Sequence, residues 1–287
     1  MSMSLKMEEI DIIENNISLL KTSIEFEEVI KDCLSEKYSD SEIGEIDLLE
    51  YRRDKVNQLK YRFSNIYNLD ILSPENGFSI LNIDDSEDFK IKKYLHRFLS
   101  FKSLTGGEGA NAEGSAELFE FISANAVKSF LGEGSHSLMV GEKRGNLTKE
   151  RLIQITEELH EKPGVYHNLP KKAKDDGVDF IVFKPMDKRD VGNIVILGQA
   201  CLGWHFSQKK SIYDRWKDEY ITFAVKPPTT LLSVVSYLDN DKLKEVHSVF
   251  GNSIVFDRGR IMKYYDITDV KLNNKIIDFV NEKINEE

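Results

Sequence analysis

The sequence predicts a mixed α/β (α+β) fold, in which a small central mixed sheet is flanked by helices and follows a helical N-terminal region. Three observations favour this fold class. Apolar residues recur at helical spacing in the first hundred residues, and no proline occurs before Pro74. Two β-branched, apolar runs at 178–183 and 194–201 enclose a polar turn, which is typical of a hairpin. A glycine-rich segment at 105–115 separates the two patterns, so we expect a boundary there.

The N-terminal region begins with Ile10, Ile13 and Ile17, whose spacing places them on one face of a helix. Ser73-Pro74-Glu75-Asn76-Gly77 is a strong loop signal. In order, we expect helices over 10–30, 41–67 and from the acidic loop 84–88 to about residue 104. Residues 1–105 are therefore predicted to form a helical N-terminal region that contacts a partner or target.

The remaining residues, 106–287, combine helical and strand patterns. Thr148 is a predicted helix N-cap, Gly132 a predicted helix end, and Pro227-Pro228 should stop a strand. We expect helices over 113–131, 148–160, 207–220, 229–238 and 270–286, and strands over 178–183, 194–201, 221–225 and 253–256. This second region is predicted to carry the chemistry.

Charge and cysteine content limit the classes of function. The chain has 287 residues, with 39 Lys+Arg against 49 Asp+Glu, and its net charge of −10 argues against a surface coated with basic residues. It leaves room for a local basic groove. Two cysteines in unlike contexts make a disulfide framework implausible, and no basic leader or long apolar run is present. We therefore expect a cytoplasmic protein that makes no contact with a membrane.

The most informative stretch surrounds the predicted hairpin. Asp175-Asp176-Gly177-Val178-Asp179 places several carboxylates at the mouth of a strand, where they could hold a hard cation such as Mg²⁺. On the next strand, Gln199 shares a face with Cys201, and a buried amide in an apolar strand requires a partner. The alternative is structural: a turn that enters a strand, and a glutamine that bonds a neighbouring loop.

These residues carry a family resemblance. Phe119-Glu120 on a helix, Asp175-x-Gly177-Val178-Asp179 before a strand and Gln199-Ala200-Cys201 at the end of the next strand resemble the PD-(D/E)XK nuclease superfamily. The likeness is to its Mrr-like restriction-endonuclease branch, which reads Phe-Glu, Asp-x-Gly-Ile-Asp and Gln-x-Lys in that order. It covers about residues 113–220 and implies a restriction-endonuclease-like core.

The resemblance also implies roles for individual residues. Asp179 would be the principal metal-binding carboxylate, Gln199 would occupy the second ligand position, and Glu120 would be the helix-borne acid. Glu117, one turn earlier, is the substitute for Glu120. The implied cofactor is Mg²⁺ or Mn²⁺, which activates water and neutralises charge in phosphodiester hydrolysis.

One position departs from the family pattern. Cys201 stands where the family has a lysine, and a thiol cannot supply a fixed ammonium group. Lys209, or Lys210 as its alternate, could reach the same space from the following helix. If neither does, the site is degenerate and binds without cutting.

Basic residues near the motif could contact a nucleic-acid backbone. The predicted nucleic-acid-binding residues are Lys171, Lys172, Lys174, Lys210, Arg258 and Arg260. For Arg258 and Arg260, an equal alternative is a salt-bridged helix start with Asp257 as its N-cap.

The resemblance implies a metal-dependent DNA endonuclease that hydrolyses phosphodiester bonds in bacterial restriction or anti-phage defence. The alternative is a catalytically degenerate nuclease-fold subunit that binds DNA or a protein partner in a defence complex. The N-terminal helices could also mediate contact with that partner or formation of a homo-oligomer.

Overall fold

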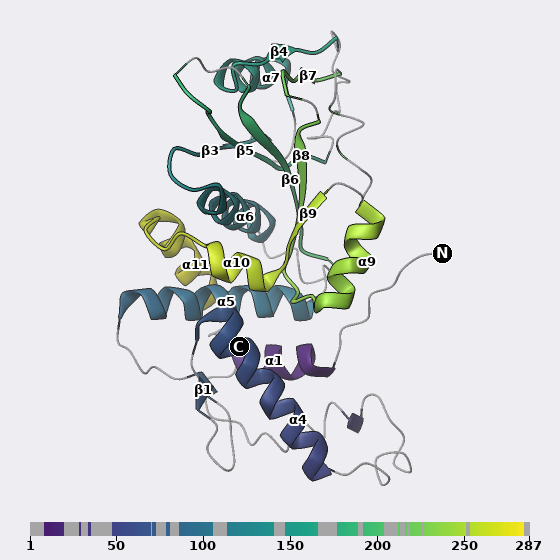
Figure 1. Ribbon diagram of the computed structural model, residues 1–287. Coiled ribbons are helices and arrows are strands. Elements are labelled where there is room, and N and C mark those ends of the chain that lie inside the picture. The colour runs from purple at the N-terminus through teal and green to yellow at the C-terminus, as the bar shows by residue number, and fades with distance from the viewer. Residues whose placement is uncertain are drawn as a thin grey trace.

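A computed structural model describes the greater part of the chain. The described residues are 9–19, 29, 34–35, 48–69, 71–72, 79–80, 86–105, 114–140, 147–165, 177–188, 192–203, 212, 216, 219–225, 227–250 and 253–283. They form a mixed α/β structure with a five-stranded mixed sheet and two small two-stranded sheets (Figure 1). The coarse fold class predicted from the sequence is therefore confirmed. No helix in these ranges is long and apolar enough to cross a membrane.

The large sheet has the spatial order β3-β5-β6-β8-β9. Its strands are β3 (His136–Met139), β5 (Phe180–Lys184), β6 (Ile194–Cys201), β8 (Thr229–Val234) and β9 (Ser253–Phe256). β5 is antiparallel to both of its neighbours, β3 and β6, whereas β6, β8 and β9 run parallel to one another. Phe180 lies opposite Gly198 in the register of β5 and β6, so the predicted hairpin is confirmed.

Helices cover both faces of this sheet and extend below it (Figure 1). They are α1 (Glu9–Leu19), α4 (Leu48–Tyr61), the π-helix η1 (Arg62–Tyr67), α5 (Glu87–Thr105), α6 (Ser115–Leu131), α7 (Lys149–Glu158), α9 (Asn240–Phe250), α10 (Arg258–Tyr264) and α11 (Val270–Lys283). The small sheets pair β1 (Ile71–Leu72) with β2 (Ser79–Ile80) and β4 (Lys162–Pro163) with β7 (Ile221–Thr222). In the view of Figure 1, the small sheet of β4 and β7 lies at the upper end of the large sheet and α5 crosses beneath it. The small sheet of β1 and β2 lies beyond α5, as do α1 and α4.

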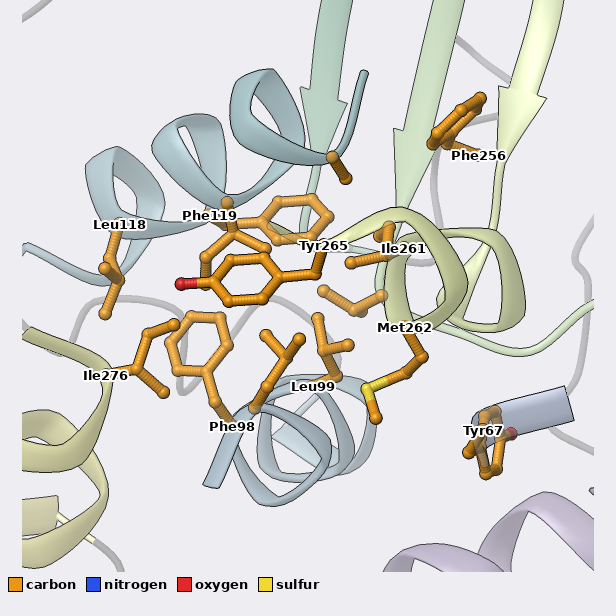
Figure 2. Close-up of a cluster of buried hydrophobic side chains, with 14 of the residues drawn as sticks. Tyr67, Phe98, Leu99, Leu118, Phe119, Phe256, Ile261, Met262, Tyr265 and Ile276 are labelled. Atoms are coloured by element: carbon orange, nitrogen blue, oxygen red, sulfur yellow. The ribbon is translucent and has the colours of Figure 1, made fainter. Parts of the chain in front are cut away.

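The main apolar core lies between the sheet and these lower helices. Figure 2 shows Phe119 of α6, Tyr265 after α10 and Phe98 of α5 converging on one another, with Ile276 of α11 beside them. The same cluster includes Ile13 of α1 and continues to the sheet. Helices on both sides of the predicted 105/106 boundary thus share one core, because each buries its apolar face against the others.

The opposite face of the sheet has two smaller cores. Ile181 and Leu197 pack with Leu152 and Ile155 of α7 and with the buried Trp216. Beside them, a third cluster lies under α9 and contains Cys201. Strands β5, β6 and β8 are therefore buried on both faces, which explains their nearly continuous apolar sequences.

Several predicted elements are confirmed. The Thr148 side chain accepts a hydrogen bond from Arg151 N at 3.1 Å and caps α7, and Gly132 ends α6 with a positive φ of 81°. The helix expected over 229–238 is wrong, because these residues form β8 and the bend after it. Its apolar run is buried on both sides, a case in which periodicity does not separate strand from helix. Most of the helix expected over 207–220 lies outside the described residues.

Candidate functional site

Asp179 is held by backbone hydrogen bonds immediately before β5. Gly177, with a positive φ of 84°, turns the chain just upstream. The Asp179 N–H donates to Gly198 O at 2.9 Å, and its carbonyl accepts from Val140 N at 3.0 Å. Its carboxylate Oδ2 accepts from Ala200 N at 2.6 Å. These contacts place the Asp179 carboxylate against β6, directly beside the backbone that follows Gln199.

Gln199 lies near the end of β6, with β5 on one side and β8 on the other. Gln199 is only 5% exposed, and in the register of β6 and β8 it lies opposite Leu232. Strand alternation places it on the face that Leu197 and Cys201 share. Among the described residues, its amide makes no hydrogen bond. The structure therefore brings Asp179 and Gln199 together on neighbouring strands, as the sequence predicts.

The helix-borne acid is placed differently. Helix α6 packs Phe119 and Ile122 against the same apolar cluster as Ile196 of β6, on the face opposite Gln199. Glu120 is partly buried on α6. Because Gln199 is on the other face of β6, it points away from the helix that carries Glu120. Glu117 lines a pocket of about 300 Å³ between α6 and α11, together with Lys275, Asp278 and Glu282. The predicted set of three ligands is thus divided between two faces of the sheet.

A metal centre made of several acidic or imidazole side chains is also absent from the described ranges. No group of three or more His, Cys, Asp or Glu residues could hold an ion there. Asp175 and Asp176, the other carboxylates of the motif, lie outside these ranges. Of the predicted oxygen donors that the structure describes, Asp179 and Gln199 are the two that lie next to each other on adjacent chain segments of the sheet.

Cys201, at the position where the resemblance implies a lysine, is a buried thiol. It is 8% exposed, packs in the apolar cluster with Leu232 and Val246, and its Sγ–H donates to Gly203 O at 3.4 Å. This environment is typical of a structural cysteine. The candidate replacements Lys209 and Lys210, and the basic run Lys171, Lys172 and Lys174, lie outside the described residues and stay predictions.

The prediction that Arg258 contacts nucleic acid is wrong. Its side chain is 1% exposed, its Nη1 lies 2.5 Å from Glu14 Oε1, and its Nε donates to Val235 O at 3.0 Å. A guanidinium buried in the interior cannot reach a phosphate. Burial of this arginine is possible because a carboxylate from the N-terminal helix compensates its charge.

The neighbouring Arg260 is tied to the start of α10. Its backbone N–H donates to Asp257 Oδ1 at 3.0 Å, so Asp257 is the N-cap of α10. The guanidinium of Arg260 donates to Val255 O on the edge strand β9, and the residue is partly buried. The alternative interpretation, a helix start capped by Asp257, is therefore confirmed.

A buried ionic network connects α1 with η1, α5 and α10. Arg62 Nη1 lies 2.7 Å from Asp11 Oδ1 and 2.8 Å from Glu14 Oε2, and His96 Nε2 lies 3.2 Å from Glu14 Oε1. Burial alone would raise the pKa of Glu14, but the guanidinium of Arg258, the His96 hydrogen bond and Arg62 hold it well below its usual range. The network is close to neutral overall, which makes its burial tolerable.

Sequence reasoning missed this network, although a signal was present. Glu14 follows Ile10 by four residues and precedes Ile17 by three, so it lies on the apolar face of α1. An acid on such a face needs a buried cation. The sequence does not tell which cation, because Arg62 and Arg258 come from distant segments.

Compared with protein-family models, curated proteins and solved structures, the chain matches none of them. The resemblance to the nuclease superfamily therefore depends only on the short motifs around Glu120, Asp179 and Gln199.

Proposed function

We propose that the chain is a metal-dependent DNA endonuclease that hydrolyses phosphodiester bonds, with Asp179 and Gln199 holding Mg²⁺ or Mn²⁺ beside β5. The observation that carries the proposal is the Asp179 carboxylate fixed against β6 next to Gln199. A mixed sheet flanked by helices, as in Figure 1, is the coarse arrangement that the resemblance implies. The setting we propose is restriction or anti-phage defence in a bacterial cytoplasm.

The donor chemistry fits a hard cation. A carboxylate and an amide supply oxygen ligands, and protein-bound Mg²⁺ commonly uses one or two carboxylates and completes its shell with water and substrate phosphate. When bound, the ion would activate water and neutralise charge on the phosphate. Because Gln199 is neutral, we expect weaker metal binding than in an all-carboxylate site. Asp175 and Asp176 are the nearest further donors in the sequence.

The structure also changes which other residues the proposal uses. Glu120 leaves the ligand set, since α6 and Gln199 lie on opposite faces of the sheet. Arg258 leaves the DNA-binding set because it is buried. Lys209 or Lys210 remains the proposed cation in place of Cys201, and Lys171, Lys172 and Lys174 remain the proposed phosphate contacts.

The second candidate function is a nuclease-fold subunit that binds DNA or a protein partner without cutting. The burial of Cys201 in an apolar cluster favours it, because the position of the family's lysine supplies no charge. The two candidates differ in whether metal binding at Asp179 leads to cleavage.

Cleavage of supercoiled plasmid by the purified full-length chain, with Mg²⁺ or Mn²⁺, tests the first candidate. Asp179→Asn is the decisive variant, because asparagine keeps an oxygen acceptor for Ala200 N and removes the charge that binds the metal. We expect Asp179→Asn to cleave at least about 100-fold more slowly than the wild type, which is the order of the effect of removing one key electrostatic group from an active site. Glu117→Gln is the matched control and should cleave normally.

If the wild type cleaves no plasmid with either Mg²⁺ or Mn²⁺, or if Asp179→Asn cleaves as well as the wild type, the endonuclease proposal is overturned. Calorimetry with Mn²⁺ separates the two candidates further. DNA binding without cleavage and without Asp179-dependent metal binding would support the degenerate subunit. The efficiency of phage plating on cells that express the wild type or Asp179→Asn checks the defence setting.

A further inference from the structure

A pocket opens beside the buried ionic network, well away from Asp179 in the sequence. It has a volume of about 420 Å³ and lies between the end of α4 and the segment that leads from β8 into α9. Its lining residues are Asn57, Gln58, Tyr61, Arg62, Tyr237 and Asp239. This volume is within the range of small-molecule sites, about 300–1,000 Å³.

The floor of the pocket is held rigidly. Arg62 is 6% exposed, is fixed by the carboxylates of Asp11 and Glu14, and stacks over the Tyr237 ring with its Cζ 4.1 Å from the ring centroid. The Tyr67 ring contacts Tyr237 edge-on, at 6.3 Å between centroids. Arg62 also begins the π-helix η1, an irregularity that is frequent at functional sites. Rigid walls lower the entropic cost of binding.

The backbone that carries Tyr237 is fixed as well. Leu238 N donates to Asp257 Oδ2 at 3.1 Å, and Arg258 N donates to Ser236 O at 3.0 Å. Asp239 Oδ1 accepts from the N–H groups at the start of α9, at 2.9 Å and 2.8 Å. The wall opposite α4 is thus anchored from both ends.

The three lining residues of α4, Asn57, Gln58 and Tyr61, are polar and uncharged. Asn57 is exposed, and Gln58 Nε2 donates to Asp54 Oδ2 at 2.7 Å, a bond that does not use the carbonyl oxygen of Gln58. Tyr61 is 58% exposed, although it lines the pocket. These three residues therefore offer hydrogen-bond donors, acceptors and an exposed aromatic side chain.

The formal charges of the lining and of the ionic network below it cancel, and Asp54 adds one carboxylate next to Gln58. The charged side chains that line the pocket or belong to the network below it are Arg62, Arg258 and Lys242 on one side and Asp11, Glu14 and Asp239 on the other. Arg62 is paired with Asp11 and Glu14, so a phosphate finds no uncompensated cation in the lining. The Asp239 carboxylate is engaged by the N–H groups at the start of α9, which makes it a weaker partner for a cationic ligand. The pocket suits a flat, neutral ring with donors and acceptors on its edge.

We propose that this pocket binds a nucleobase, with Tyr61 stacking on the ring and the amides of Asn57 and Gln58 contacting its edge. Aromatic side chains stack on bases, and amides pair with their donor and acceptor edges. The base could belong to a free nucleotide or to an unpaired position of a nucleic-acid strand, since the chemistry of recognition is the same. This site is independent of the proposed metal site.

The test uses the full-length protein and two kinds of probe. Saturation-transfer NMR with adenosine, guanosine, cytidine and uridine reports binding of the free base, and ribose and inorganic phosphate serve as negative probes. Fluorescence anisotropy with a labelled single-stranded oligonucleotide, compared with its duplex, reports binding of a base within a strand. Tyr61→Ala and Asn57→Ala change exposed residues of α4, so the fold should be retained. Lys60→Ala, exposed on the same helix and outside the pocket lining, is the matched control.

We expect Tyr61→Ala to weaken nucleobase binding about 10-fold, in line with the loss of one stacking contact, and Lys60→Ala to leave nucleoside binding unchanged. Nucleoside binding identifies a free nucleotide as the source, and binding of the single strand alone identifies a strand. Asp179→Asn should bind as the wild type does, whether or not DNA is cleaved. Binding of neither probe, or equal binding by Tyr61→Ala, overturns the proposal.

Discussion

Glu14 and Arg258 form an ion pair in the interior of the protein, although 244 positions separate them in the chain. Their side chains are 0% and 1% exposed, and their closest oxygen and nitrogen atoms are 2.5 Å apart. The pair joins α1 to the start of α10, directly after the last strand of the large sheet. The N-terminal helix is therefore part of the structure that supports the sheet.

Replacement of Glu14 by alanine should strongly destabilise the fold. It leaves Arg258 and Arg62 buried with one carboxylate fewer, and removal of one partner from a buried ion pair costs about 3–5 kcal/mol. Urea unfolding followed by circular dichroism measures the change. Asp241→Asn is the control, because its ion pair with Lys244 is exposed and should contribute little. A change for Glu14→Ala no larger than for the control would contradict the assigned role of the pair.

The buried His96 predicts a pH dependence of stability. Its Nδ1 lies 2.8 Å from Ser18 Oγ, and its Nε2 faces Glu14. Burial lowers the pKa of His96, against the opposing effects of Glu14 and with a smaller contribution from Arg258. The folded state therefore binds this proton less readily than the unfolded state, whose histidine pKa is about 6.5.

The sign follows from this difference. The contribution of His96 to the free energy of unfolding is fully present above about pH 6.5. It is lost as pH falls below that value, by at most about 1.4 kcal/mol per pH unit. Denaturant unfolding measured between about pH 5 and 8 should show stability falling as pH falls, and His96→Gln should make this dependence on pH weaker. His136→Gln, on the exposed edge strand β3, should keep it. An unchanged slope in His96→Gln would exclude His96 as the cause.

Gly198 has no room for a side chain. A Cβ atom at this position would lie 2.2 Å from Cε2 of Phe180, the residue opposite it in the hairpin. Gly198→Ala should therefore destabilise the protein by about 1–3 kcal/mol, as other overpacked cores do. Gly198→Ala should cost less stability in a Phe180→Leu background than in the wild type, because the shorter side chain leaves room for the new Cβ atom. Strictly additive effects in thermal unfolding would show that the two residues do not compete for space.

Lysine at position 201 would supply the amine that the proposed resemblance implies, but it would place that amine in an apolar cluster. We expect Cys201→Lys to destabilise the fold by at least about 2 kcal/mol at neutral pH, because the buried ammonium lacks a partner in the cluster. Burial should lower the pKa of the new amine, so the penalty should shrink as pH rises towards about 10. Cys201→Ala controls for the loss of the thiol and should show no such pH dependence. Thermal unfolding at the two pH values decides the matter.

Local sequence determined much of what surrounds the candidate site. Thr148 and Gly132 mark helix ends because caps depend on neighbouring backbone groups. The polar turn between two apolar runs was enough to predict the β5–β6 hairpin, which brings Asp179 next to Gln199. These features involve residues close in sequence or joined by a single turn, so patterns of period two and 3.6 reveal them.

The tertiary structure alone decided the rest. Residues 229–234 form a strand because neighbouring strands satisfy their backbone on both sides, whereas their apolar sequence suits a buried helix equally well. Gln199 is separated from Glu120 because β6 directs it away from α6. Arg258 is a buried structural residue, and not a phosphate contact, because the fold brings Glu14 to it. The cost of burying a charge depends on partners from the whole chain, and no local pattern contains that information.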